Sequence, residues 1–111
     1  MNSELEILFK KQVEWVNTHK LDISNDEKLK CYGYYKQAVC GNNIDKQPWS
    51  IEYEKKAKWV AWESNKGMSK DEAMKSYIIS IKDIINKYNL KYNYYFKCLL
   101  LIKLFYIIYN G

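Results

Sequence analysis

The chain has 111 residues, of which 48% are hydrophobic, so it is long enough for one domain with a buried core and too short for two. Its formal net charge of +5 comes from lysine alone, because the sequence contains no arginine. Lysine meets phosphate as a mobile point charge and lacks the planar fork with which arginine reads base edges, which argues against a nucleic-acid-binding protein.

The charge is unevenly distributed along the chain. Up to Leu90 there are 15 lysines and 13 acidic residues, whereas residues 91–111 contain three lysines and no acidic residue. We therefore predict one nearly neutral domain over residues 1–90 and a separate basic extension over residues 91–111.

The three cysteines, Cys31, Cys40 and Cys98, follow no metal-ligand spacing. Cys31 and Cys40 would be separated by roughly 13 Å along a continuous helix, too far for a disulfide. The chain also opens without a basic region followed by an apolar signal core. We expect reduced thiols, no metal site and a cytoplasmic location.

Three Ser-x-x-Glu boxes predict helix starts, because in such a box each side chain accepts a hydrogen bond from the other residue's unpaired backbone amide. The boxes are Ser3 with Glu6, Ser24 with Glu27, and Ser69 with Glu72. After the first box, apolar residues recur every three to four positions from Leu5 to Val16. This period predicts a helix that ends at about His19 and buries one face.

The second predicted helix follows Ser24 and ends at Gly41. Its apolar stripe is Leu29, Tyr32, Tyr35 or Lys36, and Val39. Residues 41–50 contain a glycine, two asparagines, an aspartate and the only proline of the chain, which predicts a loop that leads into a third helix.

The third helix is predicted from about Tyr53 to Asn65, with Gly67 as its stop. Its predicted buried face consists of Tyr53, Ala57, Val60 and Ala61, with Trp59 and Trp62 beside it as core residues. The fourth helix begins at Ser69, and its stripe consists of Ala73, Tyr77, Ile78, Ile81, Ile84, Ile85 and Tyr88. Four amphipathic helices with short or moderate connections predict an all-α four-helix bundle around one shared core.

Two linked motifs lie on these helices. The first is Tyr32-Gly33-Tyr34-Tyr35-Lys36-Gln37-Ala38, followed by Gly41 and Pro48. The second runs from Lys56 through Trp62 and continues from Lys66 through Lys75 to Tyr77. Together they resemble the signature of the acyl-CoA-binding protein family, and the resemblance covers about Phe9 to Tyr88.

The sequence departs from that family pattern at several positions. Lys55 stands where the family usually has a glycine, Asn42 where it has an acid, and Gln47 and Trp49 replace a basic residue and a glycine beside Pro48. Glu54 stands where the family often has a lysine near the nucleotide.

The resemblance implies a four-helix acyl-CoA-binding bundle that carries and pools long-chain fatty acyl-CoA esters inside the cell. It implies no catalysis and no cofactor besides this ligand. It also implies a binding site, which consists of Tyr32, Gly33, Tyr34, Tyr35, Lys36, Lys58 and Tyr77.

The residue types at the site fit such a ligand, which joins an apolar chain to an adenine and several phosphates. Lys36 and Lys58 would form charge-assisted hydrogen bonds to the ribose 3'-phosphate region. Tyr32 and Tyr35 lie three residues apart on one helix face, where one ring can stack on adenine and a phenol can donate to phosphate. Tyr77 would close the site from the fourth helix, and the acyl chain would occupy an apolar groove of the bundle.

The pattern alone would assign several of these residues more ordinary roles. Tyr32 and Tyr35 would be core residues, and Lys36 and Lys58 would be solvated helix lysines. The linked motifs favour contact with the ligand over both of these ordinary roles. His19 has no partner at a catalytic or metal spacing, so we expect a surface residue at a helix end.

Residues 94–109 are apolar or aromatic except for Lys97 and Lys103, and the family pattern has no counterpart for them. A run this short with a lysine near its middle is a poor transmembrane segment. Three interpretations stay open: a further helix packed on the bundle or a partner, a membrane contact, and translation of an AT-rich intron.

Two other classes of function have weaker support. An acyl-CoA-processing enzyme would need a nucleophile with a positioned base or a metal, and the single histidine and scattered cysteines form neither. A nucleic-acid-binding module could use the tyrosines and lysines, but the body is nearly neutral. We therefore expect a monomeric acyl-CoA carrier, with a membrane-associated acyl-CoA or lipid-binding module that uses the tail as the alternative.

Overall fold

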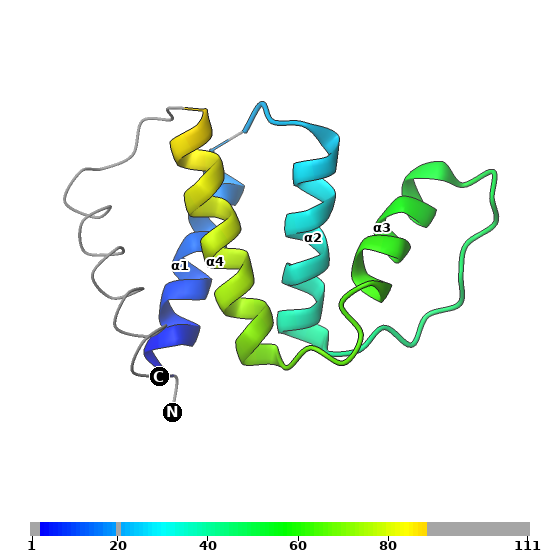
Figure 1. Cartoon of the computed structure of the whole chain (residues 1–111), viewed down its shortest axis with the longest axis horizontal. Helices are drawn as coiled ribbons and strands as arrows, with labels where there is room; N and C mark the ends of the chain where they lie inside the picture. The colour runs from blue at the N-terminus through cyan, green and yellow to red at the C-terminus, as the bar shows by residue number, and fades with distance from the viewer. Residues whose placement is uncertain (1–2, 20, 89–111) are drawn as a thin grey trace.

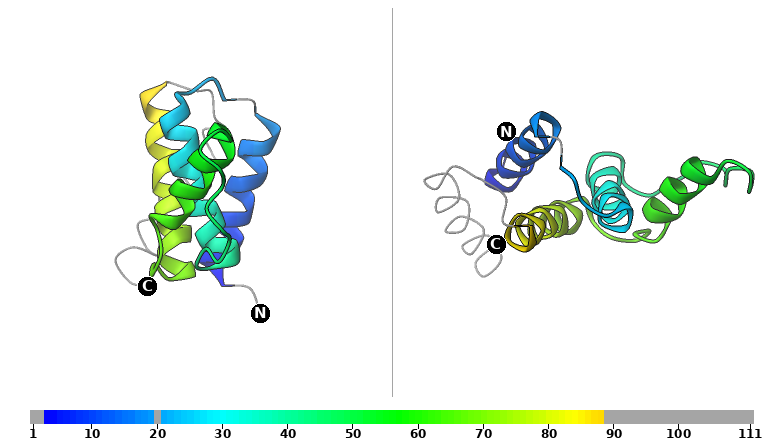
Figure 2. Two further views of the ribbon diagram at one scale, coloured as in Figure 1. Left: turned by 90° about the vertical axis from the view of Figure 1, so that its right-hand side faces the viewer. Right: turned by 90° about the horizontal axis from the view of Figure 1, so that it is seen from above.

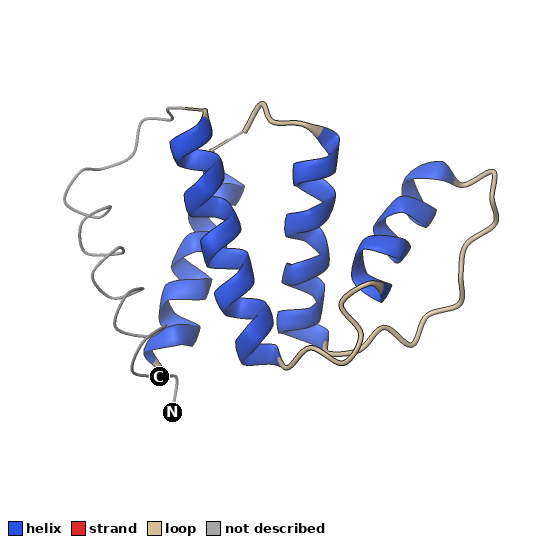
Figure 3. Ribbon diagram, in the orientation of Figure 1, coloured by secondary structure: helices blue, strands red, loops and turns tan. Residues whose placement is uncertain are grey.

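A computed structural model describes residues 3–19 and 21–88, and these form four α-helices (Figures 1 and 3). The helices are α1 (Glu4–Thr18), α2 (Asn25–Cys40), α3 (Tyr53–Glu63) and α4 (Lys70–Lys87). The predicted all-α bundle and the approximate bounds of all four helices are confirmed. The extension, including Cys98, lies outside the described residues. None of the described helices is long and apolar enough to cross a membrane.

Serine residues begin three of the helices, as predicted. Ser24 and Ser69 form complete capping boxes with Glu27 and Glu72, whereas Ser3 only accepts a hydrogen bond from the backbone amide of Glu6. Gly41, after α2, and Gly67, between α3 and α4, have φ values of 78° and 93°, in the left-handed region that favours glycine.

The apolar core lies between α1, α2 and α4. Its buried members are Leu5, Leu8 and Phe9 of α1, Cys31 and Ala38 of α2, and Ala73, Tyr77, Ile78, Ile81, Ile84 and Ile85 of α4. The stripe predicted for the fourth helix is therefore buried, apart from Tyr88, which packs at its edge. Burial of these side chains joins three helices into one unit.

Helix α3 packs on α2 and lies outside this core (Figure 2). The prediction of one core shared by four helices is wrong in this respect. Tyr53 and Val60 are 79% and 48% exposed, although we predicted a buried face there, and Val39 of α2 is 49% exposed. Periodicity identified residues on one side of each helix, but it does not indicate how completely a neighbouring helix covers that side.

The carboxylate of Glu27 joins the start of α2 to the end of α4. It accepts hydrogen bonds from the Ser24 hydroxyl (2.8 Å) and the Tyr88 phenol, and it forms an ion pair with Lys87 (3.4 Å). The hydrogen bond from Tyr88 is the largest cause that lowers the pKa of Glu27, from 4.5 to about 2, followed by that from Ser24. The charged form is thus favoured in the folded protein.

Substitution Tyr88→Phe tests this junction. A carboxyl group with a lowered pKa stabilises the fold fully above its unfolded pKa of 4.5, and this contribution is lost as the pH falls toward about 2. We therefore expect a lower free energy of unfolding for Tyr88→Phe at neutral pH, with a difference that shrinks on acidification. Denaturant unfolding at several pH values measures it, with Tyr53→Phe at an exposed ring as the control. A pH-independent difference would contradict the assignment.

Candidate ligand-binding site

A pocket of about 510 Å³ opens between the end of α1, the α1–α2 connection, α2 and α4. We call it the tyrosine pocket. Its lining residues are Val13, Val16, Asn17, His19, Leu21, Ile23, Lys28, Cys31, Tyr32, Tyr35, Tyr77 and Ile81. Its size falls within the range of small-molecule sites, and its wall combines aliphatic and aromatic side chains with a few polar groups.

Three of the predicted site residues, Tyr32, Tyr35 and Tyr77, meet in this pocket although they come from two helices. Phe9 fixes two of the rings: its centroid lies 5.2 Å from that of Tyr77 in an edge-to-face contact and 6.2 Å from that of Tyr35 in a stacked one. The Tyr35 and Tyr77 centroids are 6.4 Å apart. Such contacts hold the aromatic wall in a defined arrangement.

Burial raises the pKa values of two groups in the pocket wall. The pKa of the Tyr77 phenol lies well above its ordinary value, and that of the Cys31 thiol is raised to about 11. Both groups therefore keep their protons at neutral pH. Tyr77 is thus available as a hydrogen-bond donor, whereas Cys31 lacks the thiolate form that a nucleophile requires.

The two predicted lysines lie at the junction of α2 and α3. Lys58 of α3 places its Nζ 5.7 Å from the ring centroid of Tyr32, and Lys36 of α2 places its Nζ 4.7 Å from that of Trp62. Each cation thus rests on an aromatic ring of the other helix. The contact between Lys58 and Tyr32 brings a positive charge to the edge of the tyrosine pocket.

On the other side of this junction, α2 and α3 enclose an apolar groove of about 420 Å³. Its lining residues are Leu29, Tyr53, Lys56, Ala57, Val60 and Ala61. Leu29 precedes Tyr32 by three residues on α2, so the groove and the tyrosine pocket lie close to each other. The partly exposed face of α3 described above forms one wall of this groove.

Gly33 and Tyr34 line neither cavity. Gly33 is buried against α3, where an added Cβ would overlap with the carbonyl oxygen of Ala61 and lie 2.9 Å from the Asn65 side-chain nitrogen. Tyr34 is partly buried and packs against the apolar core. In this structure both residues contribute to helix packing, and their contact with the ligand stays a prediction.

The sequence-based prediction omitted other pocket residues. Lys28 precedes Tyr32 by four residues, a spacing that places both on one helix face and would have indicated it. His19 is exposed at the end of α1, as predicted, but it also lines the pocket. Its ring stacks on that of Trp15 at 4.4 Å, and its Nδ1 lies 2.8 Å from the Trp15 carbonyl oxygen. No sequence pattern indicated that His19 would line the pocket.

The two predicted core tryptophans hold the loop between α2 and α3. Trp62 is buried, as predicted, and its Nε1 donates to the Gly41 carbonyl at 2.8 Å. Trp59 is only half-buried, and its Nε1 donates to the Asp45 carbonyl at 2.8 Å. The prediction of a core position is therefore wrong for Trp59, because its polar edge is used to fix the loop.

Two further sequence-based expectations concern cysteine and metal chemistry. Cys31 is buried and Cys40 exposed, and both are free thiols. Within residues 3–19 and 21–88, no cluster of three or more histidine, cysteine or acidic side chains could hold a metal ion.

Comparison with known proteins shows the family. The family model described as "Acyl CoA binding protein" matches residues 6–81. The chain belongs to the acyl-CoA-binding protein family. It is 42% identical over 73 residues to acyl-CoA-binding protein homolog 1 of Caenorhabditis elegans, covering 66% of this chain and 85% of that protein. It is 38% identical over 82 residues to the acyl-CoA-binding protein of Saccharomyces cerevisiae, covering 74% and 94%.

Solved structures from the same family share the fold. Acyl-CoA-binding protein 2 of Oryza sativa superposes with a TM-score of 0.72 at 34% identity, covering 80% of this chain and 99% of the other. The protein from Moniliophthora perniciosa gives a TM-score of 0.74 at 29% identity, covering 89% and 93%. The family resemblance predicted from the two motifs is confirmed.

Substitution Gly33→Ala tests the close contact of α2 with α3. Helix propensity alone predicts a gain of roughly 1 kcal/mol from replacing glycine in a helix interior. The overlap with Ala61 predicts the opposite sign, a loss of roughly 1 to 3 kcal/mol from overpacking. Denaturant unfolding gives the sign directly, and a more stable variant would contradict the observed approach of the helices.

Proposed function

We propose that this protein binds long-chain fatty acyl-CoA esters and carries them in the cytoplasm as a monomer. The single observation that supports this most strongly is the arrangement around Tyr32. An aromatic pocket, a lysine and an apolar groove adjoin one another there, in a chain whose family is named for the same ligand. An acyl-CoA ester needs these three surfaces together.

The tyrosine pocket would receive the nucleotide half of the ligand. The rings of Tyr32 and Tyr35 provide stacking surfaces for adenine, and the protonated Tyr77 phenol can donate to a phosphate or ribose oxygen. Lys58 and Lys28 lie at the edge of this pocket, where the phosphates would emerge. Lys36 would reach the same phosphates by leaving the ring of Trp62.

The groove between α2 and α3 would receive the acyl chain. Its lining is almost entirely aliphatic or aromatic, and it lies beside the pocket, so a thioester could continue from one cavity into the other. Each methylene removed from water contributes roughly 0.8 kcal/mol, which favours long chains over short ones. The proposal includes no chemical step on the ligand.

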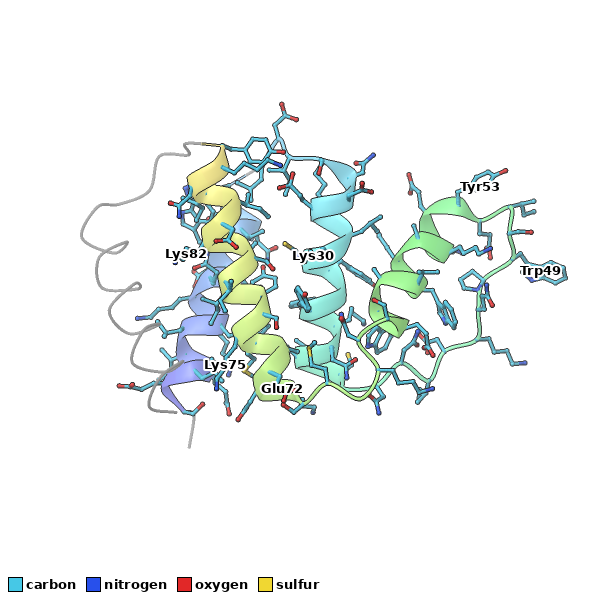
Figure 4. The ribbon with its side chains drawn as sticks, in the orientation of Figure 1. Lys30, Trp49, Tyr53, Glu72, Lys75 and Lys82 are labelled. Atoms are coloured by element: carbon cyan, nitrogen blue, oxygen red, sulfur yellow. The ribbon has the colours of Figure 1, made fainter. Side chains whose placement is uncertain are left out.

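Substitution Lys58→Ala should weaken palmitoyl-CoA binding. A charge-assisted hydrogen bond contributes roughly 1.5 to 3 kcal/mol, and the exposure of Lys58 places it near the lower limit, so we expect roughly tenfold weaker binding. Isothermal titration calorimetry measures this effect. Lys82→Ala on α4, away from α3 in Figure 4, is the matched control. Equal affinities of the two variants would contradict the role of Lys58.

Substitution Glu54→Lys should have the opposite effect. Glu54 precedes Lys58 by four residues on α3, so its carboxylate lies beside the cation that would meet the phosphates. Reversing this charge should tighten palmitoyl-CoA binding by roughly threefold at low salt, because exposed pairs contribute less than about 1 kcal/mol. Asp83→Lys makes the same change of charge on α4, at a residue that lines neither the tyrosine pocket nor the groove. A similar gain in both variants would indicate a general charge effect.

A further inference from the structure

The four most exposed large apolar side chains of the described residues belong to one short segment. Ile44 is 92% exposed, Trp49 and Ile51 are each 80% exposed, and Tyr53 is 79% exposed. We call these four side chains the apolar tip. Trp49 lies on the loop before α3 and Tyr53 at the start of α3, at the end of the molecule far from α1 and α4, and Trp49 points outward (Figure 4). Single exposed apolar residues are common, but four within ten residues at a protruding end are not.

Hydrogen bonds hold the backbone of this segment in place. The Trp59 Nε1 donates to the Asp45 carbonyl at 2.8 Å, next to Ile44. The Glu52 carboxylate accepts from the Trp49 amide at 3.3 Å, and the Glu52 amide donates to the Trp49 carbonyl at 2.9 Å. The apolar side chains are thus presented to solvent by a defined loop. Trp49 also occupies a position where the family pattern has a glycine.

We propose that the apolar tip inserts into the interfacial region of a lipid bilayer. Tryptophan and tyrosine are enriched at that depth, where an amphipathic ring meets both headgroups and chains, and isoleucine can enter the acyl boundary. Lys46, Lys55 and Lys56 flank the tip and can meet headgroup phosphates. Residues 44–58 contain four lysines and three acids, so the apolar side chains contribute most of the binding.

The shape of the surface favours a bilayer over a protein partner. Trp49 and Tyr53 lie at a protruding end of the molecule (Figure 4), whereas protein docking sites are usually broad and complementary patches. It is also continuous with the groove between α2 and α3, since Tyr53 belongs to both and Lys56 lines the groove beside it. A protein docked by this tip would place the groove beside the membrane, where amphiphilic acyl-CoA esters partition. The link between the membrane and acyl-CoA in the groove rests on the proposed function, whereas membrane binding by the tip does not.

Sedimentation with vesicles of equimolar phosphatidylcholine and phosphatidylserine tests the proposal on the full chain. The double variant Trp49→Ser/Ile51→Ser should bind the vesicles roughly tenfold more weakly than the unaltered protein, because two side chains no longer leave water. Ile79→Ser, at a 37% exposed isoleucine on α4, is the matched control and should bind as the unaltered protein does. No vesicle binding by the unaltered protein, or equal binding by the double variant, would overturn the proposal.

A second measurement isolates the tip from any contribution of residues 89–111. Brominated lipids quench tryptophan fluorescence only at the depth of the bromine atoms. We expect quenching in the unaltered protein and its loss in Trp49→Phe, which keeps Trp15, Trp59 and Trp62. Vesicle binding without quenching, or quenching that persists in Trp49→Phe, would overturn the proposal and leave a protein partner as the alternative for this surface.

The affinity for palmitoyl-CoA without vesicles separates this inference from the proposed function. Neither Trp49 nor Ile51 lines the pocket or the groove, so the double variant should keep that affinity. Loss of vesicle binding with intact ligand binding supports the role of the tip. Loss of both would indicate a misfolded variant, and Trp49→Phe, which conserves an aromatic side chain, then decides through the quenching measurement.

Discussion

The close approach of α2 and α3 at Gly33 determines the position of Lys58, the predicted site residue on α3. Helix α3 shares no buried side chain with the apolar core, so its location depends on this backbone contact, on Trp62 and on the loop that the two tryptophans hold. The same approach places Lys58 against Tyr32 and forms the groove between the two helices. The core stabilises α1, α2 and α4, and the contact at Gly33 adds the helix on which the candidate site depends.

Local sequence signals predicted the helices well because the forces that define helix ends act over a few residues. Serine caps and the glycines after α2 and before α4 gave bounds within about a turn of those observed. The linked motifs also identified Tyr32, Tyr35 and Tyr77, which meet in one pocket from two helices. That meeting cannot be derived from periodicity, and it followed only from the family resemblance.

The remaining differences between the prediction and the structure arise because an apolar stripe on a helix does not indicate which element covers it. Tyr53, Val60 and Val39 follow the apolar period, yet all three are exposed, because α3 packs on α2 alone of the core helices and leaves an open groove beside it. Trp59 was assigned to the core by its size, whereas its indole nitrogen fixes a loop. His19 reaches the pocket through the geometry of the α1–α2 connection, which short-range patterns do not define. Uncovered apolar surface, here a groove and a protruding tip, is where such predictions fail and where binding is expected.

The central claim is that one site joins an aromatic, cationic pocket to an apolar groove, so both halves of the ligand must contribute to affinity. Calorimetric titration of the full chain with palmitoyl-CoA, coenzyme A and palmitate separates the two halves. The account predicts one-to-one binding of the ester that is far tighter than the binding of either half. An ester that binds no more tightly than coenzyme A alone would show that the groove receives no acyl chain and would contradict the account.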